Sequence, residues 1–160
     1  ESDHLNRKGI TSGKAYVGFM GVIVRSNYCA ACDADKRVTG FYTGIGFEQI
    51  TDGSSNTLVL GEKRLRPSLY DIGEWHDDIG WADGWDPDTL RATICPLAPD
   101  SEVDDSFKGL AYAFGSAHSS GMNAGFADAS VRFLRFEVDR ELFNQLGNRA
   151  DEEAADMGAL

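Results

Sequence analysis

The 160-residue chain is poor in cysteine, proline and histidine, and it has no long hydrophobic run. No stretch approaches the roughly 18 to 20 apolar residues that a membrane-spanning helix needs. The first eight residues, Glu1 to Lys8, lack the apolar core of a signal peptide. The sequence therefore predicts that this segment itself makes no contact with a membrane.

Basic residues are also scarce. The chain has 15 Lys and Arg against 26 Asp and Glu, which gives a formal net charge of −11 and a pI near 4.6. Binding to a nucleic-acid backbone or an anionic membrane surface normally depends on clustered Lys and Arg, because both partners are negatively charged. We therefore predict that nucleic acid is not a partner.

The three cysteines are Cys29, Cys32 and Cys95. Cys29-Ala-Ala-Cys32 has the C-x-x-C spacing, but a zinc ribbon needs a second such pair and only Cys95 remains. A redox-active dithiol is a weaker alternative, because the surroundings are rich in Ala and Asp and do not form a strand-to-helix junction. The favoured interpretation is a Cys29–Cys32 disulfide, which fits an extracytoplasmic location.

Length and composition predict one globular domain. A hydrophobic content of 42% is enough for a single core, and we place this domain at residues 1–149, followed by a flexible acidic tail at 150–160. The chain has 18 glycines, and its apolar segments are short with little 3.6-residue periodicity. The predicted class is α+β and β-rich, an antiparallel sheet with long loops and a short C-terminal helix.

Short apolar segments in the first half of the chain predict individual elements. β-branched and aromatic residues predict strands at 15–25 and 57–62 and a short extended piece at 40–44. Residues 47–50 are expected to form one helical turn, and 51–56 have the composition of a turn.

The second half contains a predicted hairpin. Its strands are 122–127 and 131–136, joined around Asp128-Ala129. We expect Phe126 to face Val131 and Ala124 to face Phe133 across the strands.

A short helix is predicted after the hairpin, at residues 139–146. Asp139 is its N-cap and Gly147 its stop. Its apolar stripe consists of Leu142, Phe143 and Leu146.

Residues 74–99 contain all three tryptophans, many acids and little periodicity, and are predicted to form a long structured loop. Its carboxylates are hard oxygen donors of the kind that Ca²⁺ prefers, and the candidate calcium ligands are Asp83, Asp86 and Asp88. The spacing is not that of an EF-hand. Two alternatives stay open for loop 74–91: a solvated acidic loop whose tryptophans cover the core, and a surface on which the tryptophans stack on a glycan.

His118 and Asp128 suggest a catalytic or metal-binding pair, since imidazole and carboxylate are frequent partners in both. An intervening strand, at about 3.3 Å per residue, would however hold them roughly 20 Å apart. We therefore interpret Asp128 as a turn residue, and His118 as a packing or hydrogen-bonding residue near Asp139. The serines next to His118 lie in no Gly-x-Ser-x-Gly elbow, so we predict that the protein is not an enzyme.

Several stretches resemble a large, mostly planctomycete family of prepilin-like proteins that has a C-terminal His-x9-Asp-Gly motif and is also classed as bacterial extracellular solute-binding. They occur in the family's order and together run over about two-thirds of the chain. The stretches are Ile50 to Glu62 (ITDGSSNTLVLGE), Gly84 to Arg91 (GWDPDTLR), Phe114 to His118 (FGSAH) continuing through Val131-Arg132-Phe133, and Leu146 to Arg149 (LGNR).

The resemblance implies a pilin or pseudopilin globular domain, and the chain departs from the family pattern in three places. The prepilin leader and long N-terminal helix are missing, as in a cut piece, a processed product or a separately encoded half. Ala129 stands where the family has Gly, so either the turn differs in type or some strain is tolerated. Pro87 stands where we expect Asn.

The function implied by the resemblance is structural. We expect a non-enzymatic, extracytoplasmic pilin-like or pseudopilin-like domain of a type II secretion or surface filament system. Its expected partners are protein subunits of that assembly or the missing N-terminal helix. Pseudopilins can carry structural calcium in C-terminal loops, which supports the calcium prediction. The main alternative is an extracellular module that binds calcium, a glycan or another solute through loop 74–91, and a hydrolase is the third.

Overall fold

The computed structural model describes residues 21–23, 45–80, 88–103, 110–153 and 155–159. Several predicted features lie outside these residues: the extended piece at 40–44, the Cys29–Cys32 bridge, and the loop residues Asp83, Asp86 and Pro87. Of the strand predicted at 15–25, only residues 21–23 are described. They form a bend, so the prediction is wrong for these three residues.

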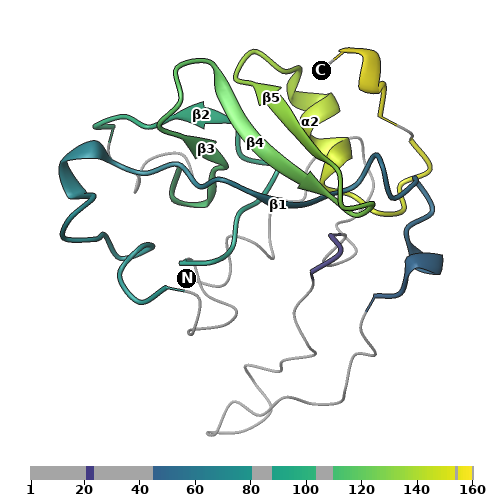
Figure 1. Ribbon diagram of the computed structural model, residues 1–160, viewed down its shortest axis with the longest axis horizontal. Helices are drawn as coiled ribbons and strands as arrows, with labels where there is room; N and C mark the ends of the chain where they lie inside the picture. The colour runs from purple at the N-terminus through teal and green to yellow at the C-terminus, as the bar shows by residue number, and fades with distance from the viewer. Residues whose placement is uncertain (1–20, 24–44, 81–87, 104–109, 154, 160) are drawn as a thin grey trace, which may run out of the picture.

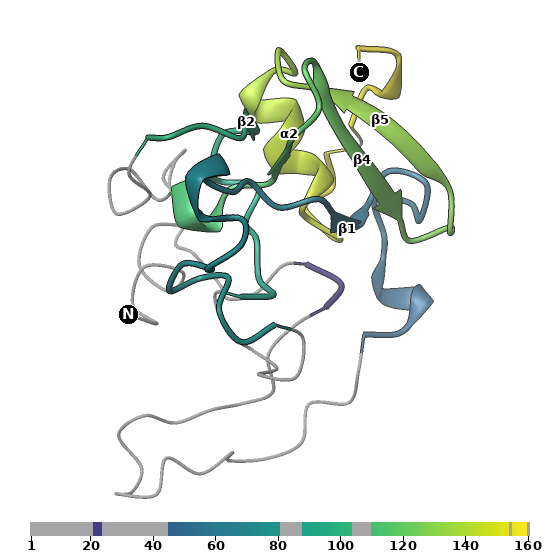
Figure 2. The ribbon, with the colours of Figure 1, turned by 60° about the vertical axis from the view of Figure 1, so that its left-hand side comes forward.

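The centre of the fold is an antiparallel sheet with the strand order β1-β4-β5. Its strands are β1 (Leu58–Gly61), β4 (Gly121–Phe126) and β5 (Val131–Arg135). A helix, α2 (Arg140–Leu146), lies against the β4–β5 hairpin in both views of the ribbon (Figures 1 and 2). The predicted α+β, β-rich class with an antiparallel sheet and a short C-terminal helix is confirmed.

The remaining elements are short. Strands β2 (Ala98–Pro99) and β3 (Gly115–Ser116) pair in parallel beside the main sheet. The 3₁₀ helices are η1 (Phe47–Gln49), η2 (Pro67–Leu69), η4 (Leu110–Tyr112) and η5 (Met157–Ala159). Strand β1 and helix η1 lie where the sequence predicts a strand at 57–62 and a helical turn at 47–50.

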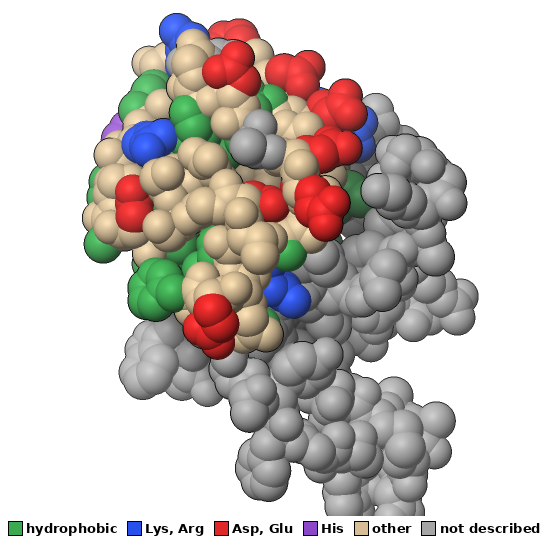
Figure 3. Space-filling view, turned by 90° about the vertical axis from the view of Figure 1, so that its right-hand side faces the viewer, with side chains coloured by type: hydrophobic (Ala, Val, Ile, Leu, Met, Phe, Trp, Pro, Cys, Tyr) green, Lys and Arg blue, Asp and Glu red, His purple; other side chains and the backbone are tan. Residues whose placement is uncertain are grey.

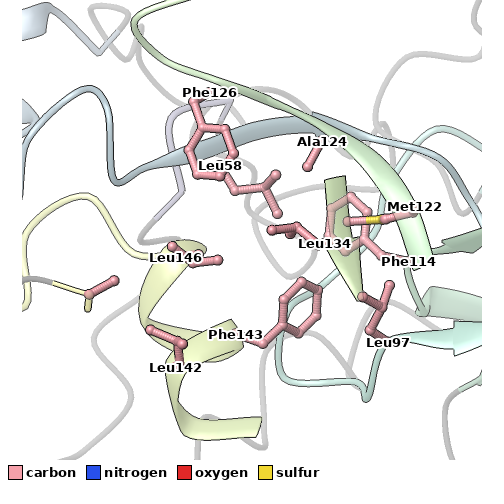
Figure 4. Close-up of a cluster of buried hydrophobic side chains, with 11 residues drawn as sticks. Leu58, Leu97, Phe114, Met122, Ala124, Phe126, Leu134, Leu142, Phe143 and Leu146 are labelled. Carbon is pink, nitrogen blue, oxygen red and sulfur yellow. The ribbon is translucent and has the colours of Figure 1, made fainter. Parts of the chain in front are cut away.

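The main core fills the space between the sheet and α2. Alternate side chains of β4 point to this inner face, and Met122, Ala124 and Phe126 are all buried. Figure 4 shows them converging with residues from β1, β5, α2 and the segment before β3. The buried cluster is Leu58, Leu97, Phe114, Met122, Ala124, Phe126, Leu134, Leu142, Phe143, Leu146 and Ala155.

Helix α2 forms as its sequence predicts. The side chain of Asp139 accepts hydrogen bonds from the backbone N–H groups of Glu141 and Leu142, which satisfies two donors that the first turn cannot pair internally. The predicted apolar stripe of the helix is buried against the sheet. Gly147 ends the helix with φ −80°. A Cβ at position 147 would lie only 2.9 Å from the Cβ of Thr93. The absence of a side chain at Gly147 therefore leaves room for Thr93.

The β4–β5 hairpin exists, but its register differs by one residue from the prediction. Gly125 pairs with Val131 and Ala124 with Arg132. The reason is the loop, because Phe126 N–H donates to Ser130 O and Ala129 N–H donates to Phe126 O. These bonds leave residues 127–129 as a three-residue loop, whose last residue is normally left-handed. Phe126 therefore faces the core, whereas Val131 faces outward.

Residues after 150 contact the domain, and the flexibility of the 150–160 tail stays a prediction. The carboxylate of Asp52 accepts hydrogen bonds from the backbone N–H groups of Asp151 at 2.8 Å and Glu152 at 3.1 Å. Ala155 is buried in the main core, and Met157 packs against it. One of these contacts comes from the Asp52 carboxylate, about a hundred residues upstream, which no local sequence pattern indicates.

Candidate binding surface on the outer face of the sheet

The face of the sheet opposite α2, here called the outer face, carries exposed apolar side chains. Leu60, Gly125 and Val131 lie directly opposite one another in the three strands, so they share this face. Leu60 is 64% exposed and Val131 is 70% exposed. Phe133, two residues further along β5, is 47% exposed. The outer face therefore presents a row of large apolar groups where an antiparallel sheet usually presents polar ones.

At the hairpin end of the outer face the surface is hollowed into a pocket of about 410 Å³. Its walls come from four separate parts of the chain: Val22, the segment with Ile45 and Phe47, strand β1 with Leu60, and the hairpin with Val131. Nearly all of the lining side chains are apolar. Its volume falls within the range of about 300 to 1,000 Å³ typical of small-molecule sites.

The pocket stays open because small residues line its hairpin side. A Cβ at Gly125 would lie 3.6 Å from the Cβ of Leu60, which is an ordinary van der Waals contact, so a side chain can begin here without a clash. Ala129 also lines the pocket and has φ +65°. An alanine in this left-handed region costs roughly 1 kcal/mol. Of the two explanations given for Ala129, the structure shows tolerated strain in a turn that requires a positive φ.

Charges at the rim of the pocket are mainly negative. Asp128 lies in the hairpin loop, and the hydroxyl and amide of Ser130 lower the pKa of its carboxyl. Gly46 separates the two wall residues Ile45 and Phe47, and the Glu48 carboxylate lies directly over this glycine. Arg132 pairs with Ala124 on the inner face, and its guanidinium lies 4.9 Å from the centre of the Phe126 ring there. On this side of the molecule, acidic side chains lie among hydrophobic ones (Figure 3).

A polar cluster lies beyond the apolar row, where β1 ends. The Glu62 carboxylate accepts a hydrogen bond from Asn123 N–H at 2.6 Å and lies 3.3 Å from His118 Nε2. His118 therefore contacts Glu62 and Asn123, and these are not the partners near Asp139 that we predicted. Its side chain is 53% exposed. Sequence reasoning missed Glu62, although this residue ends one of the stretches that resemble the prepilin-like family.

The two residues of the His-x9-Asp pattern are not brought together. All six residues of β4 lie between His118 and the hairpin loop that holds Asp128. Asp128 Oδ1 accepts a hydrogen bond from Ser130 N–H at 2.9 Å, which is the turn role that the sequence predicts. The pattern therefore marks the two ends of a strand and does not assemble a catalytic pair.

Asp88 is the one candidate calcium ligand that the structure describes. It is 3% exposed, and its Oδ1 accepts hydrogen bonds from the backbone N–H groups of Asp78 at 2.6 Å and Ile79 at 3.3 Å. This oxygen therefore organises the loop. The described residues contain no group of three His, Cys, Asp or Glu side chains suited to a metal ion. Because Asp83 and Asp86 are not described, the calcium site stays a prediction.

Charged side chains are buried beneath this loop, which the sequence analysis did not predict. Arg64 is fully buried and donates hydrogen bonds to Ser101 O, Ser101 Oγ and Val103 O. Burial lowers the pKa of Arg91 to about 10. His76 is also fully buried, and burial followed by the nearby Arg91 charge lowers its pKa. The only sequence signal is the basic run Lys63-Arg64-Leu65-Arg66 directly after β1.

Comparison with known proteins gives one family. No curated protein and no solved structure matches the chain. Within the described residues, no helix has the length and apolar character needed to cross a membrane. The model of the family SBP_bac_10, described as "Protein of unknown function (DUF1559)", matches residues 7–141. This match covers most of the chain and agrees with the part of the resemblance that concerns a solute-binding class of unknown function. The chain therefore belongs to the SBP_bac_10 (DUF1559) family.

Proposed function

We propose that this protein is a non-enzymatic, extracytoplasmic, pilin-like assembly domain whose outer sheet face contacts a neighbouring protein subunit. The observation that carries the proposal is the apolar row of Leu60, Val131 and Phe133, with exposed fractions of 64%, 70% and 47%. A contiguous exposed apolar patch on a soluble domain is typical of a surface that another protein covers.

The inner face of the same sheet provides a comparison, because its apolar side chains are covered by another element. There, Met122 and Leu134 oppose each other across β4 and β5 and are both fully buried beneath α2. In the same strand Val131 and Phe133 point outward and Leu134 points inward, so the strand carries apolar side chains on both faces beside Arg132 and Arg135. Strands that are apolar on both faces are typical of sheets covered on both sides.

The extracytoplasmic location is supported by the family, whose short name denotes bacterial solute-binding proteins. The non-enzymatic role is supported by the separation of His118 from Asp128 along β4. Neither residue is placed to transfer a proton to or from a group held by the other.

Self-association of the purified chain tests the assembly role for the case in which neighbouring subunits are copies of this chain. We expect sedimentation velocity to show concentration-dependent association that Val131→Lys reduces at least tenfold, because the change places a charge at the centre of the apolar row. The matched control is Ile72→Lys. Ile72 is 77% exposed but lies in the 70–73 turn, away from the sheet, so this variant is expected to associate like the wild type.

Two results would contradict the proposal. One is equal weakening by Val131→Lys and Ile72→Lys, which would indicate non-specific hydrophobic association. The other is a wild-type chain that remains monomeric up to millimolar concentration. Localisation is tested separately by fractionating native cells, and recovery of the full-length protein in the cytoplasm would contradict the extracytoplasmic assignment.

A further inference from the structure

We propose that the pocket at the hairpin end of the outer face binds a small ligand with a compact aliphatic or aromatic body that is uncharged or cationic. This inference does not depend on subunit assembly. It concerns the hollow beside Gly125, whereas the assembly proposal depends on the row of exposed side chains along the sheet.

The first argument is the shape of the pocket. A bare sheet face is flat, but here Ile45 and Phe47 of the preceding segment form a wall that stands against β1 and the hairpin. Phe47 is 74% exposed, so this wall is an apolar surface that is open to water. The enclosed volume of about 410 Å³ is suited to a single ring or a medium-length aliphatic chain.

The second argument is the polar group at the pocket wall. Among the lining residues, Ser130 carries the only polar side chain. Its hydroxyl is buried, and its hydrogen bond to the Asp128 carboxylate lowers the pKa of that group. A hydroxyl that donates to a carboxylate still has lone pairs that can accept a hydrogen bond. A ligand hydroxyl or ammonium group can donate to it.

The third argument is the charge at the rim, which selects against anions. Asp128 and Glu48 place two carboxylates near the rim, whereas Arg132 belongs to the inner face, where it lies over the Phe126 ring. The chain as a whole has a net charge of −11. An anionic ligand would lose hydration on entering the apolar pocket and would also be repelled by the rim. A cationic group can remain at the rim beside Asp128.

Three ligands with the same six-carbon chain test this selectivity: hexan-1-ol, hexylamine in its protonated form, and hexanoate. Each is titrated into the ¹⁵N-labelled full chain at neutral pH and at a protein concentration where it is monomeric. We expect saturable amide shifts at Gly125, Ala127 and Val131 with hexanol and hexylammonium. Hexanoate should bind at least about fivefold more weakly than hexylammonium, given two carboxylates at the rim.

Two variants locate the site. Gly125→Leu places a side chain in the hollow, and its Cβ would make only ordinary contacts, so it should keep the fold and weaken hexanol binding at least tenfold. Phe47→Ala removes an exposed wall outside the core and should weaken binding several-fold without lowering the melting temperature. Phe133→Ala, on the same face but outside the pocket, is the matched control and should bind like the wild type.

Three results would overturn the proposal. The first is the absence of saturable shifts for all three ligands. The second is hexanoate binding as tightly as hexylammonium. The third is the appearance of hairpin shifts only at protein concentrations where the chain self-associates, which would assign the pocket to subunit contact. If the chain self-associates but binds none of the ligands, only the ligand proposal fails. If it binds the ligands but does not self-associate, only the assembly proposal fails.

Discussion

The sheet with α2 and the loop region at 63–103 both bury side chains completely, but with opposite chemistry. Between sheet and helix the buried groups are apolar, such as Leu134 at 0% and Phe143 at 1% exposure. In the loop region they are charged or polar, such as Arg64 at 0% and Asp88 at 3%. Apolar burial stabilises without requiring a particular partner, whereas each buried polar group needs a specific one. The first region therefore tolerates approximate packing, and the second depends on individual hydrogen bonds.

The largest expected effect lies in the apolar region. Phe143→Ala removes a fully buried ring that packs edge-to-face on Phe114 at a centroid distance of 6.0 Å. We expect the free energy of unfolding to fall by about 3 to 5 kcal/mol, as measured by urea denaturation. Phe133→Ala on the outer face is the control and should cost less than about 1 kcal/mol. Similar losses for both variants would show that the outer face is covered as well as the inner one.

The second prediction concerns the charged region and its response to pH. The pKa of His76 is lowered in the folded chain by burial and by Arg91, while Glu74 and Asp77 oppose the shift. The unfolded chain therefore takes up this proton first, and stability is lost as the pH falls below about 6.5. Between pH 6.5 and 5.5 this loss amounts to at most about 1.4 kcal/mol.

Urea denaturation at these two pH values, compared between wild type and His76→Gln, isolates the contribution of His76. The variant should lose less stability on acidification than the wild type. His118→Gln is the matched control, because His118 is largely exposed, and it should follow the wild type. If His76→Gln and the wild type respond equally, the imidazole is already protonated in the fold or is accessible to water.

The smallest expected effect is a gain at the hairpin loop. Ala129 has φ +65°, a conformation that glycine adopts without strain. Ala129→Gly should therefore raise the free energy of unfolding by about 0.5 to 1 kcal/mol, measured as a shift of the thermal midpoint. Ala127→Gly in the same loop is the control and should not stabilise, because Ala127 has no positive φ. Destabilisation by Ala129→Gly would contradict the strained turn and would indicate that the alanine methyl group packs in the pocket wall.

The hairpin and α2 could be predicted because their signals are local. The cap at Asp139 and the stripe Leu142, Phe143 and Leu146 lie within a few residues of one another, so one short window contains the whole pattern. The register could not be predicted in the same way. A two-residue and a three-residue loop fit the same letters around Asp128-Ala129, and the bonds between Phe126 and Ser130 O and between Ala129 and Phe126 O select the longer one.

The candidate binding surface was not predicted at all. Its pocket combines Ile45 and Phe47 with hairpin residues more than seventy positions away, and the sequence analysis directed attention to the tryptophan and aspartate loop. The described part of that loop uses the Asp88 carboxylate to hold its own backbone. A carboxylate that accepts hydrogen bonds from its own loop and one that binds a ligand look the same in the sequence. They differ in the donors that surround them, and tertiary structure sets those donors.

The sequence by itself determined the β-rich class, the hairpin, the capped helix and the resemblance to a family, because each depends on residue types at short spacing. The tertiary structure alone decided the hairpin register, the burial of Arg64 and His76, the anchoring of the tail by Asp52 and the pocket beside Gly125. These features depend on contacts between segments far apart in the chain. Such contacts are set by how the whole core packs, and no local window of the sequence contains that information.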